Sequence, residues 1–171
     1  MGLVLTPDGV LQTGWIVNNQ EQSHELGKYL ESNKIKLCSP KGTDFSRDII
    51  EVLTYHEASD ILVKAENGKY QSILAARRKT DNTFHIEYLC SAYPGAGEWL
   101  LNKVKEFVKE NRDKFNAVTL YPYTHDLRSY YISRGFVEIP GRLVVEWRPP
   151  SGGRRKTRRM TRRMRTRSRR H

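Results

Sequence analysis

The middle of the chain carries a run of turn signals that limits which folds it can adopt. Three strand-like segments follow one another there, at residues 61–66, 70–78 and 83–91. Asn67-Gly68 separates the first two, and this dipeptide favours a two-residue hairpin because both residues tolerate positive φ. Thr80-Asp81-Asn82 turns the chain a second time. The run therefore predicts a three-stranded antiparallel meander, whose faces the remaining elements have to cover.

The segments on either side of this meander carry both helical and strand-like patterns. Amphipathic spacing and capping residues predict helices at 18–32, 45–56, 97–111 and 126–133. Shorter apolar runs predict strands at 35–38, 117–121, 137–139 and 143–147, and a turn at 7–9 predicts an N-terminal hairpin. The order is neither a regular βαβ repeat nor all-β, so we expect a mixed α/β, α+β-like fold. The length of 171 residues is enough for one core.

The basic excess of the protein lies at one end of the chain. The formal net charge is +11, and residues 154–171 contain ten Arg, one Lys and no acidic residue. Removing these 11 from the 30 basic residues leaves 19, which equals the number of acidic residues. We therefore expect a neutral body and a disordered tail that contacts nucleic acid or another polyanion. A nuclear-targeting signal and a solubilising tail are the other interpretations.

The cysteines and histidines give no sign of a scaffold or a metal site. Cys38 and Cys90 lie in apolar, strand-like segments, and two cysteines are too few for a disulfide framework, so we expect buried free thiols. The five histidines lack the spacing of metal ligands, and no metal is expected.

The sequence shows neither a membrane span nor a secretion signal, so we expect an intracellular protein. No apolar run approaches the ~20 residues of a membrane span, and the N-terminus lacks a charged-then-apolar signal segment. The tail adds the nucleus or a nucleic-acid-containing particle as further locations. Residues 1–6 fit the short N-myristoylation template, and a plain N-terminal hairpin is the other interpretation of the same residues.

Two glycines stand at the start of the helix that follows the meander. Gly95-Ala96-Gly97 comes directly after a strand, and a helix N-terminus in this position can hold phosphate on its free backbone N–H groups. A dinucleotide fingerprint needs a third glycine where Leu100 stands. A P-loop needs Gly-Lys-Ser/Thr where Glu98-Trp99 stands. A tight turn without a ligand is the remaining alternative.

Two motifs resemble those of one known family. Residues 89–101, LCSAYPGAGEWLL, resemble the acyl-CoA loop of the GNAT superfamily of N-acetyltransferases, and residues 130–136, YYISRGF, resemble its Tyr-x-x-x-Gly-Phe element. The element order from about 34 to 147 is also similar. The chain departs from the family at Ala92, where Gln or Arg is usual, and at Pro94, where a polar residue is usual.

The resemblance implies a central, mostly antiparallel sheet, flanked by helices and splayed at a cofactor cleft. Acetyl-CoA, as cosubstrate, would lie between the strands at 83–91 and 117–121, and an amine would attack its thioester directly. The residues implied to bind it are Leu89, Cys90, Ser91, Pro94, Gly95, Ala96, Gly97 and Glu98.

The resemblance also assigns catalytic roles. Tyr131 matches the family's general acid by its position four residues before Gly135, with Tyr130 as the fallback. A base or water chain has to deprotonate the amine, and Glu87 is the first candidate. His85 and His125 are the other candidates for the base, and Tyr121 and Tyr123 are expected near the acceptor.

The resemblance divides the chain into three parts. Residues 1–33 would be an N-terminal extension of hairpin and helix, 34–148 the GNAT-like acyltransferase domain, and 149–171 a Pro/Gly linker with the Arg-rich tail. A second hypothesis is a GNAT-like module without catalysis that acts as a nucleic-acid-binding or packaging protein through this tail.

Overall fold

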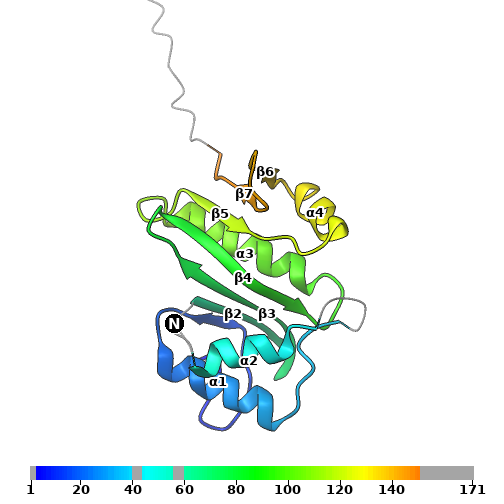
Figure 1. Cartoon of the computed structure of the whole chain (residues 1–171). Helices are drawn as coiled ribbons and strands as arrows, with labels where there is room; N and C mark the ends of the chain where they lie inside the picture. Colours follow the sequence, from blue (N-terminus) through cyan, green and yellow to red (C-terminus); the bar gives the residue numbers. More distant parts are fainter. Residues whose placement is uncertain (1–2, 40–43, 56–59, 151–171) are drawn as a thin grey trace, which may run out of the picture.

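The three segments of the meander form the centre of the molecule in a computed structural model that describes residues 3–39, 44–55 and 60–150 (Figure 1). They are β2 (Asp60–Glu66), β3 (Lys69–Arg78) and β4 (Thr83–Ser91), and neighbours pair antiparallel. Asn67 and Gly68 have φ of 51° and 74°, as a two-residue hairpin turn requires. The predicted meander is therefore confirmed.

Four more strands extend this meander into one seven-stranded sheet. Its order is β1-β2-β3-β4-β5-β7-β6, and the added strands are β1 (Gly14–Ile16), β5 (Ala117–Leu120), β6 (Val137–Glu138) and β7 (Val145–Trp147). Within the described residues, β4 and β5 are its only parallel pair. The expected mixed fold with a mostly antiparallel sheet is confirmed.

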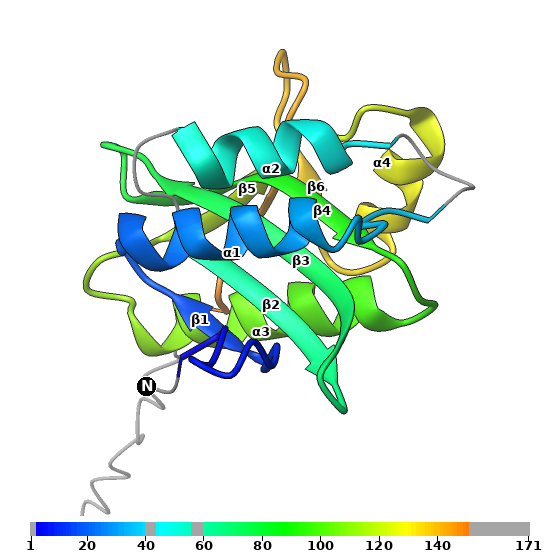
Figure 2. The ribbon, with the colours of Figure 1, turned by 90° about the horizontal axis from the view of Figure 1, so that it is seen from below.

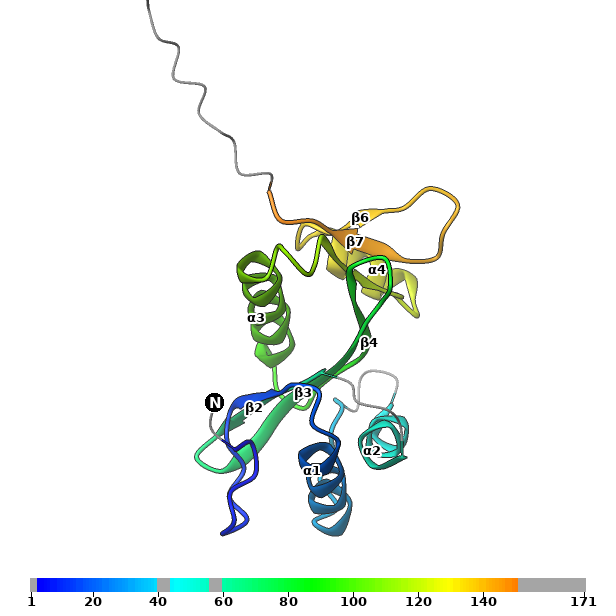
Figure 3. The same cartoon turned by 90° about the vertical axis from the view of Figure 1, so that its left-hand side faces the viewer.

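The helices cover both faces of the sheet. In Figure 3, α1 (Gln20–Ser32) and α2 (Ser46–Tyr55) lie on one side and α3 (Ala96–Glu110) on the other, and Figure 2 shows α1 and α2 side by side. The short α4 (His125–Ile132) lies beside β6 and β7. Asn19 and Thr124 cap α1 and α4, and Asp44 accepts a hydrogen bond from Ser46 N at the start of α2.

The two faces of the sheet bury two separate cores. Ile61 and Val63 of β2 pack against α1 and α2, whereas Leu62 between them packs towards α3. Because successive side chains of a strand point to opposite faces, a strand covered on both sides is apolar at nearly every position. Val4, Leu11 and Ile16 pack on the α1/α2 side, whereas Trp15 packs on the α3 side, and Leu5 and Leu11 form the bridge of the predicted N-terminal hairpin.

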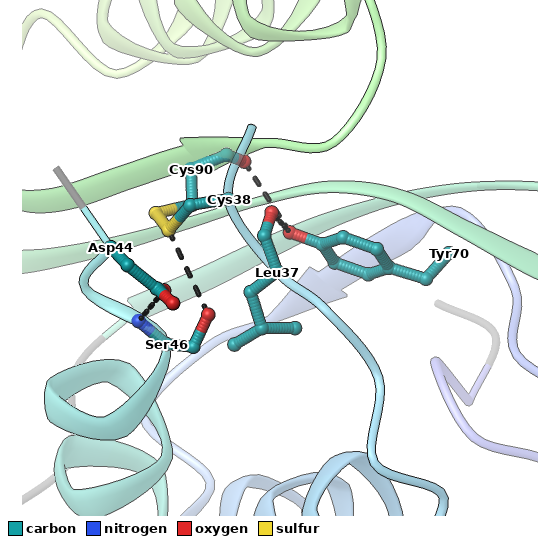
Figure 4. Close-up of a disulfide and its surroundings, with 6 residues drawn as sticks. All are labelled: Leu37, Cys38, Asp44, Ser46, Tyr70 and Cys90. Carbon is teal, nitrogen blue, oxygen red and sulfur yellow. Dashed lines mark hydrogen bonds between the residues drawn. A yellow bond between two sulfur atoms is a disulfide. The ribbon is translucent and has the colours of Figure 1, made fainter. Parts of the chain in front are cut away.

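Two expectations about the segment before α2 are wrong. Residues 35–38 form no strand, because their backbone pairs with no neighbouring strand; the Leu37 carbonyl instead accepts a hydrogen bond from the Tyr70 hydroxyl at 2.8 Å. Cys38 and Cys90 are not free thiols but form a disulfide, with their Cα atoms 4.8 Å apart (Figure 4). The apolar pattern at 35–38 arises from burial beside β4.

Several expectations fall on residues outside the described ranges. They concern His56 at the predicted end of the second helix, the first two residues of the acylation template at 1–6, and residues 151–171 of the predicted linker and tail. No helix in the described part of the chain is both long and apolar enough to cross a membrane.

The ion pair between Asp60 and Arg78 holds β2 against β3 and can be tested by mutation. Asp60 is only 2% exposed and accepts from Arg78 Nε at 2.7 Å and Nη2 at 2.9 Å. We expect Arg78→Met to lower the free energy of unfolding by about 3 kcal/mol, because it leaves a buried carboxylate unpaired. Arg128→Met, which breaks the exposed pair with Glu138, should cost less than about 1 kcal/mol. Urea unfolding of both variants measures the difference, and equal costs would contradict the prediction.

Candidate functional site

The sheet opens between its two parallel strands. β4 pairs with β5 only from Thr83 to Ile86, opposite Ala117 to Leu120, although β4 continues beside β3 as far as Ser91. In Figure 1, the C-terminal half of β4 diverges from β5. This half of β4 thus has a strand partner on one side only, among the residues that the structure describes.

A β-bulge marks the place where the strands separate. Ala75 is opposite Tyr88 and Ala76 is opposite Ile86, so Glu87 is the extra residue. The bulge reverses the alternation of side chains, because Ile86 packs on the α3 side and Tyr88 on the α1/α2 side. Glu87 therefore lies at the point where β4 changes the face that its side chains present.

The unpaired edge of β4 carries free donors. Ala92 N donates to Gln71 O of the β3 side at 3.0 Å. Because successive N–H groups of a strand point to opposite edges, the N–H groups of Ser91 and Leu89 point away from β3. They face the opening between the strands.

A cavity of about 350 Å³ fills this opening. Its walls are the unpaired half of β4, the loop that leads into α3, the residues before α2, the chain after β5, and α4. Its described lining contains seven aromatic side chains and two carboxylates but no Lys or Arg. The described lining side chains therefore supply no cation for an anionic ligand, which leaves the backbone as the source of positive potential in this part of the cavity.

The N-terminus of α3 supplies that potential. Gly95 precedes the helix with φ of +77° and offers no side-chain cap. Ala96 N donates to Tyr93 O and Trp99 N donates to Gly95 O, whereas the N–H groups of Gly97 and Glu98 have no partner among the described residues. Free N–H groups at the positive end of a helix dipole form an anion site.

The structure brings most of the predicted cofactor-binding residues to this cavity. It is lined by Leu89, Cys90, Ser91, Pro94, Gly95, Gly97 and Glu98. Ala96 is the exception among the eight, because its side chain is buried and its carbonyl accepts from Ser72 Oγ at 3.2 Å. Glu98 is paired with Arg134 at 3.0 Å, and this cation offsets the negative charge near the helix start.

Tyr131 and Tyr130 enter the cavity from α4. Tyr131 is 7% exposed, and burial raises the pKa of its hydroxyl to about 12, so it keeps its proton at neutral pH. Burial also raises the pKa of Tyr130, whose ring lies under the Arg134 guanidinium at 3.5 Å. Tyr131 is thus a phenol that stays neutral in the wall of the cavity.

Of the three candidates for a base, Glu87 is the one among the described lining residues of the cavity. One of its oxygens pairs with Arg77 Nε at 2.9 Å, and the other, Oε2, is buried with no partner among the described residues. His85 Nδ1 lies 2.9 Å from Thr119 Oγ1, and burial lowers the pKa of His85 to about 4. His85 is therefore neutral but engaged with β5, and His125 begins α4 outside the cavity lining.

Comparison with known proteins gives a match by structure but not by sequence. No protein-family model and no curated protein sequence match the chain. Tetrahymena GCN5 matches with a TM-score of 0.51 at 14% identity, over 81% of this chain and 96% of that one. The AtaT–AtaR complex bound to DNA gives a TM-score of 0.57 at 10% identity over 79% and 93% of the two chains. AtaTR bound with AcCoA gives 0.51 at 11% identity over 80% and 93%.

The protein has the GNAT fold. The fold expected from the two motifs is therefore confirmed, while the roles of individual residues stay predictions, because identities of 10–14% carry no residue function across. The separation of β4 from β5 and the uncapped start of α3 are observed directly in this GNAT fold and do not depend on the comparison.

The sequence did not predict that residues before α2 form one wall of the cleft in this GNAT fold. Phe45, just before α2, contacts the ring of Tyr123 at 4.9 Å and that of Tyr88 at 5.8 Å between centroids. Tyr121 and Tyr123, which were predicted near the acceptor, both line the cavity and lie 5.1 Å apart. Phe45 and Cys38 come from an irregular connection, so no periodic pattern in the sequence could place them there.

The two glycines before α3 should respond differently to substitution. Gly95→Ala puts a side chain at φ of +77° and should cost ~1–2 kcal/mol of unfolding free energy. Gly97→Ala places Cβ in ordinary contact, 3.4 Å from Leu89 Cδ2 and 3.5 Å from Ser91 Cβ, and should cost less than about 0.5 kcal/mol. Guanidinium unfolding of both variants tests this, and a loss in Gly97→Ala equal to that in Gly95→Ala would contradict it.

Proposed function

We propose that the protein is an acyl-CoA-dependent N-acyltransferase that transfers acetyl from acetyl-CoA to an amine. The observation that carries the proposal is that one cavity joins the open edge of β4, the uncapped start of α3 and the neutral Tyr131. The GNAT fold supports it, and so does the AcCoA bound to one of the similar structures.

The backbone of the cleft can bind the cosubstrate. The N–H groups of Gly97 and Glu98 would hold the pyrophosphate, and the pantetheine arm would lie along β4 in place of a missing strand. Leu89 and Ser91 would offer their N–H groups to the thioester carbonyl, where the oxyanion of the tetrahedral intermediate forms. Ala92, which replaces the usual side-chain donor, is compatible with a site built from backbone N–H groups.

Two side chains would move the protons. The acceptor amine is mostly protonated at neutral pH, and Glu87, with one oxygen unpartnered, would remove its proton directly or through water. The amine nitrogen then attacks the carbonyl carbon, and the carbon–sulfur bond breaks. Tyr131, which keeps its proton at neutral pH, would donate that proton to the departing CoA thiolate, and the excess proton on the attacking nitrogen would pass to Tyr131 directly or through water.

The lining of the cleft suggests the character of the acceptor. Glu87 gives it negative charge, and Phe45, Tyr88, Tyr121 and Tyr123 give it an aromatic surface. Such a lining suits an amine that arrives as a cation on a carbon chain, because aromatic faces and carboxylates both attract it.

The test separates cosubstrate binding from chemistry. We expect Tyr131→Phe to bind acetyl-CoA as tightly as the parent protein in calorimetry but to turn over ~10²-fold more slowly, because only the proton donor is removed. Gly97→Glu, which puts a carboxylate at the helix start, should bind weakly, whereas Gly97→Ala should bind normally. An unchanged rate for Tyr131→Phe in a chemistry-limited assay would remove Tyr131 from the mechanism, and no binding by the parent would overturn the proposed function.

We infer that residues 154–171 bind polyanions, on the strength of their charge alone, since they lie outside the described residues. The body to residue 153 is formally neutral, so a chain ending at Pro150 should lose duplex and single-strand binding together. For the full chain, log affinity should fall with log salt with a slope of up to about −0.9 per duplex phosphate contacted. Fluorescence anisotropy across a salt series measures this, and retained affinity in the shortened chain would assign binding to the body, with Arg77, Arg78 and Lys79 as the first candidates.

A further inference from the structure

A disulfide lies in the wall of the proposed catalytic cleft. Cys90 belongs to the unpaired half of β4, Cys38 belongs to the connection between α1 and α2, and both line the cavity. They are only 4% and 3% exposed in the whole protein, and this cavity is a face on which a small molecule can meet both of them, while Cys38 also lines a second cavity beside Tyr70. The reaction proposed above releases a thiol, that of CoA, into this same cavity.

The disulfide also holds one wall of the cleft in place. Residues 33–39 and 44–45 contain no helix or strand, and Cys38 ties this connection covalently to β4. Figure 4 shows the weaker contacts around it: the Tyr70 hydroxyl donates to Leu37 O at 2.8 Å and lies 3.4 Å from Cys90 O, and Ser46 Oγ lies 4.0 Å from Cys38 Sγ.

Phe45, on the aromatic side of the cleft, comes later than Cys38 in the connection between α1 and α2. Its ring packs on those of Tyr88 and Tyr123. If the sulfur–sulfur bond opens, Tyr70 still holds Leu37, but Cys38 loses its covalent link to β4. The Cys38 side of the cleft is therefore coupled to the state of the disulfide, whereas the N-terminus of α3 is built from a separate stretch of chain.

We propose that the Cys38–Cys90 disulfide is a thiol-exchange site for CoA, the thiol product of the proposed acyl transfer. The proposal rests on the proposed function, because it needs CoA to bind in this cavity. Its consequence is a covalent form of product inhibition, in which accumulated CoA becomes attached to the cleft that released it.

The exchange balances without any outside oxidant. The CoA thiol gives up its proton, and its thiolate attacks one cysteine sulfur in line with the sulfur–sulfur bond. A new disulfide joins CoA to that cysteine, and the other cysteine leaves as a thiolate and takes up a proton. The oxidation level is unchanged, because one disulfide and one thiol give one disulfide and one thiol. Attack by the released cysteine on the mixed disulfide expels CoA and restores the starting state.

Acetyl-CoA is the matched control for this chemistry. It carries the same nucleotide and pantetheine, but its sulfur is acylated and cannot attack a disulfide. A small monothiol such as 2-mercaptoethanol has the reacting group without the nucleotide. Because bound CoA presents its thiol at a high effective concentration, it should react faster than the small monothiol at equal bulk concentration.

The experiment uses the full oxidised chain and intact-mass spectrometry without reductant. We expect CoA to add the mass of one CoA molecule, on Cys38 or Cys90 by peptide mapping, with a rate that saturates and exceeds that of 2-mercaptoethanol ~10-fold or more. Acetyl-CoA should give no adduct, and neither should CoA with Cys38→Ser/Cys90→Ser. Turnover should fall as the adduct forms and return when free CoA is removed, because the released cysteine then expels CoA and restores the disulfide.

The outcomes separate this proposal from the proposed function. Absence of acetyl-CoA binding in calorimetry would overturn the proposed function, and this inference with it. If acetyl-CoA binds and CoA gives no adduct, the exchange site is wrong while the proposed function stands. An adduct that forms no faster with CoA than with 2-mercaptoethanol would also overturn it, because the disulfide would then react with thiols in general and not with a bound product.

Discussion

The backbone hydrogen bonds that β4 does not make with β5 determine where this protein can bind a ligand. Beyond Ile86 the two strands part, and the N–H groups of Leu89 and Ser91 face an opening in place of a partner strand. Buried backbone donors without partners are costly, so a structure that keeps them needs water or a ligand to satisfy them. The bulge at Glu87 makes the separation possible, because it bends β4 while leaving its pairing with β3 intact on both sides.

The same opening explains how a cleft without lysine or arginine in its described lining can suit a polyanionic cosubstrate. The positive potential comes from the start of α3, where Gly95 provides the αL turn and leaves two N–H groups free. Glu98 would oppose an incoming phosphate, but Arg134 pairs with it and stacks on Tyr130. Arg134 thereby joins the end of α4 to the start of α3, the two helix ends that border the cavity.

Structural features that depend on a few neighbouring residues could be predicted from the sequence. Features that depend on contacts between distant segments could not. The Asn67-Gly68 turn and the Gly95 turn have φ values that the residue types themselves favour, so the meander and the start of α3 followed from the chain alone. Residues 35–38 show the reverse case, because burial beside β4 gave them an apolar pattern that a strand would also have. Cys38 and Cys90 are 52 residues apart, and contacts between distant segments, among them those of the Tyr70 hydroxyl with Leu37 and Cys90, bring them together. Glu87 was predicted as a candidate, but the bulge that places it at the opening has no signal in the sequence.

The cleft has one half that is formed by local sequence and another that is assembled from distant segments. The half proposed to hold CoA is nearly continuous in sequence, from Leu89 to Glu98, and its binding groups are backbone N–H groups that most substitutions leave unchanged. The half proposed to hold the acceptor is assembled from the chain before α2, the bulge of β4 and the chain after β5, and its binding groups are side chains such as Phe45 and Tyr123. Substitutions there alter the acceptor surface while the first half keeps its geometry. The proposed cosubstrate therefore depends on the backbone, whereas the acceptor has to be determined from side chains on three separate segments, one of which contains Cys38 of the Cys38–Cys90 disulfide.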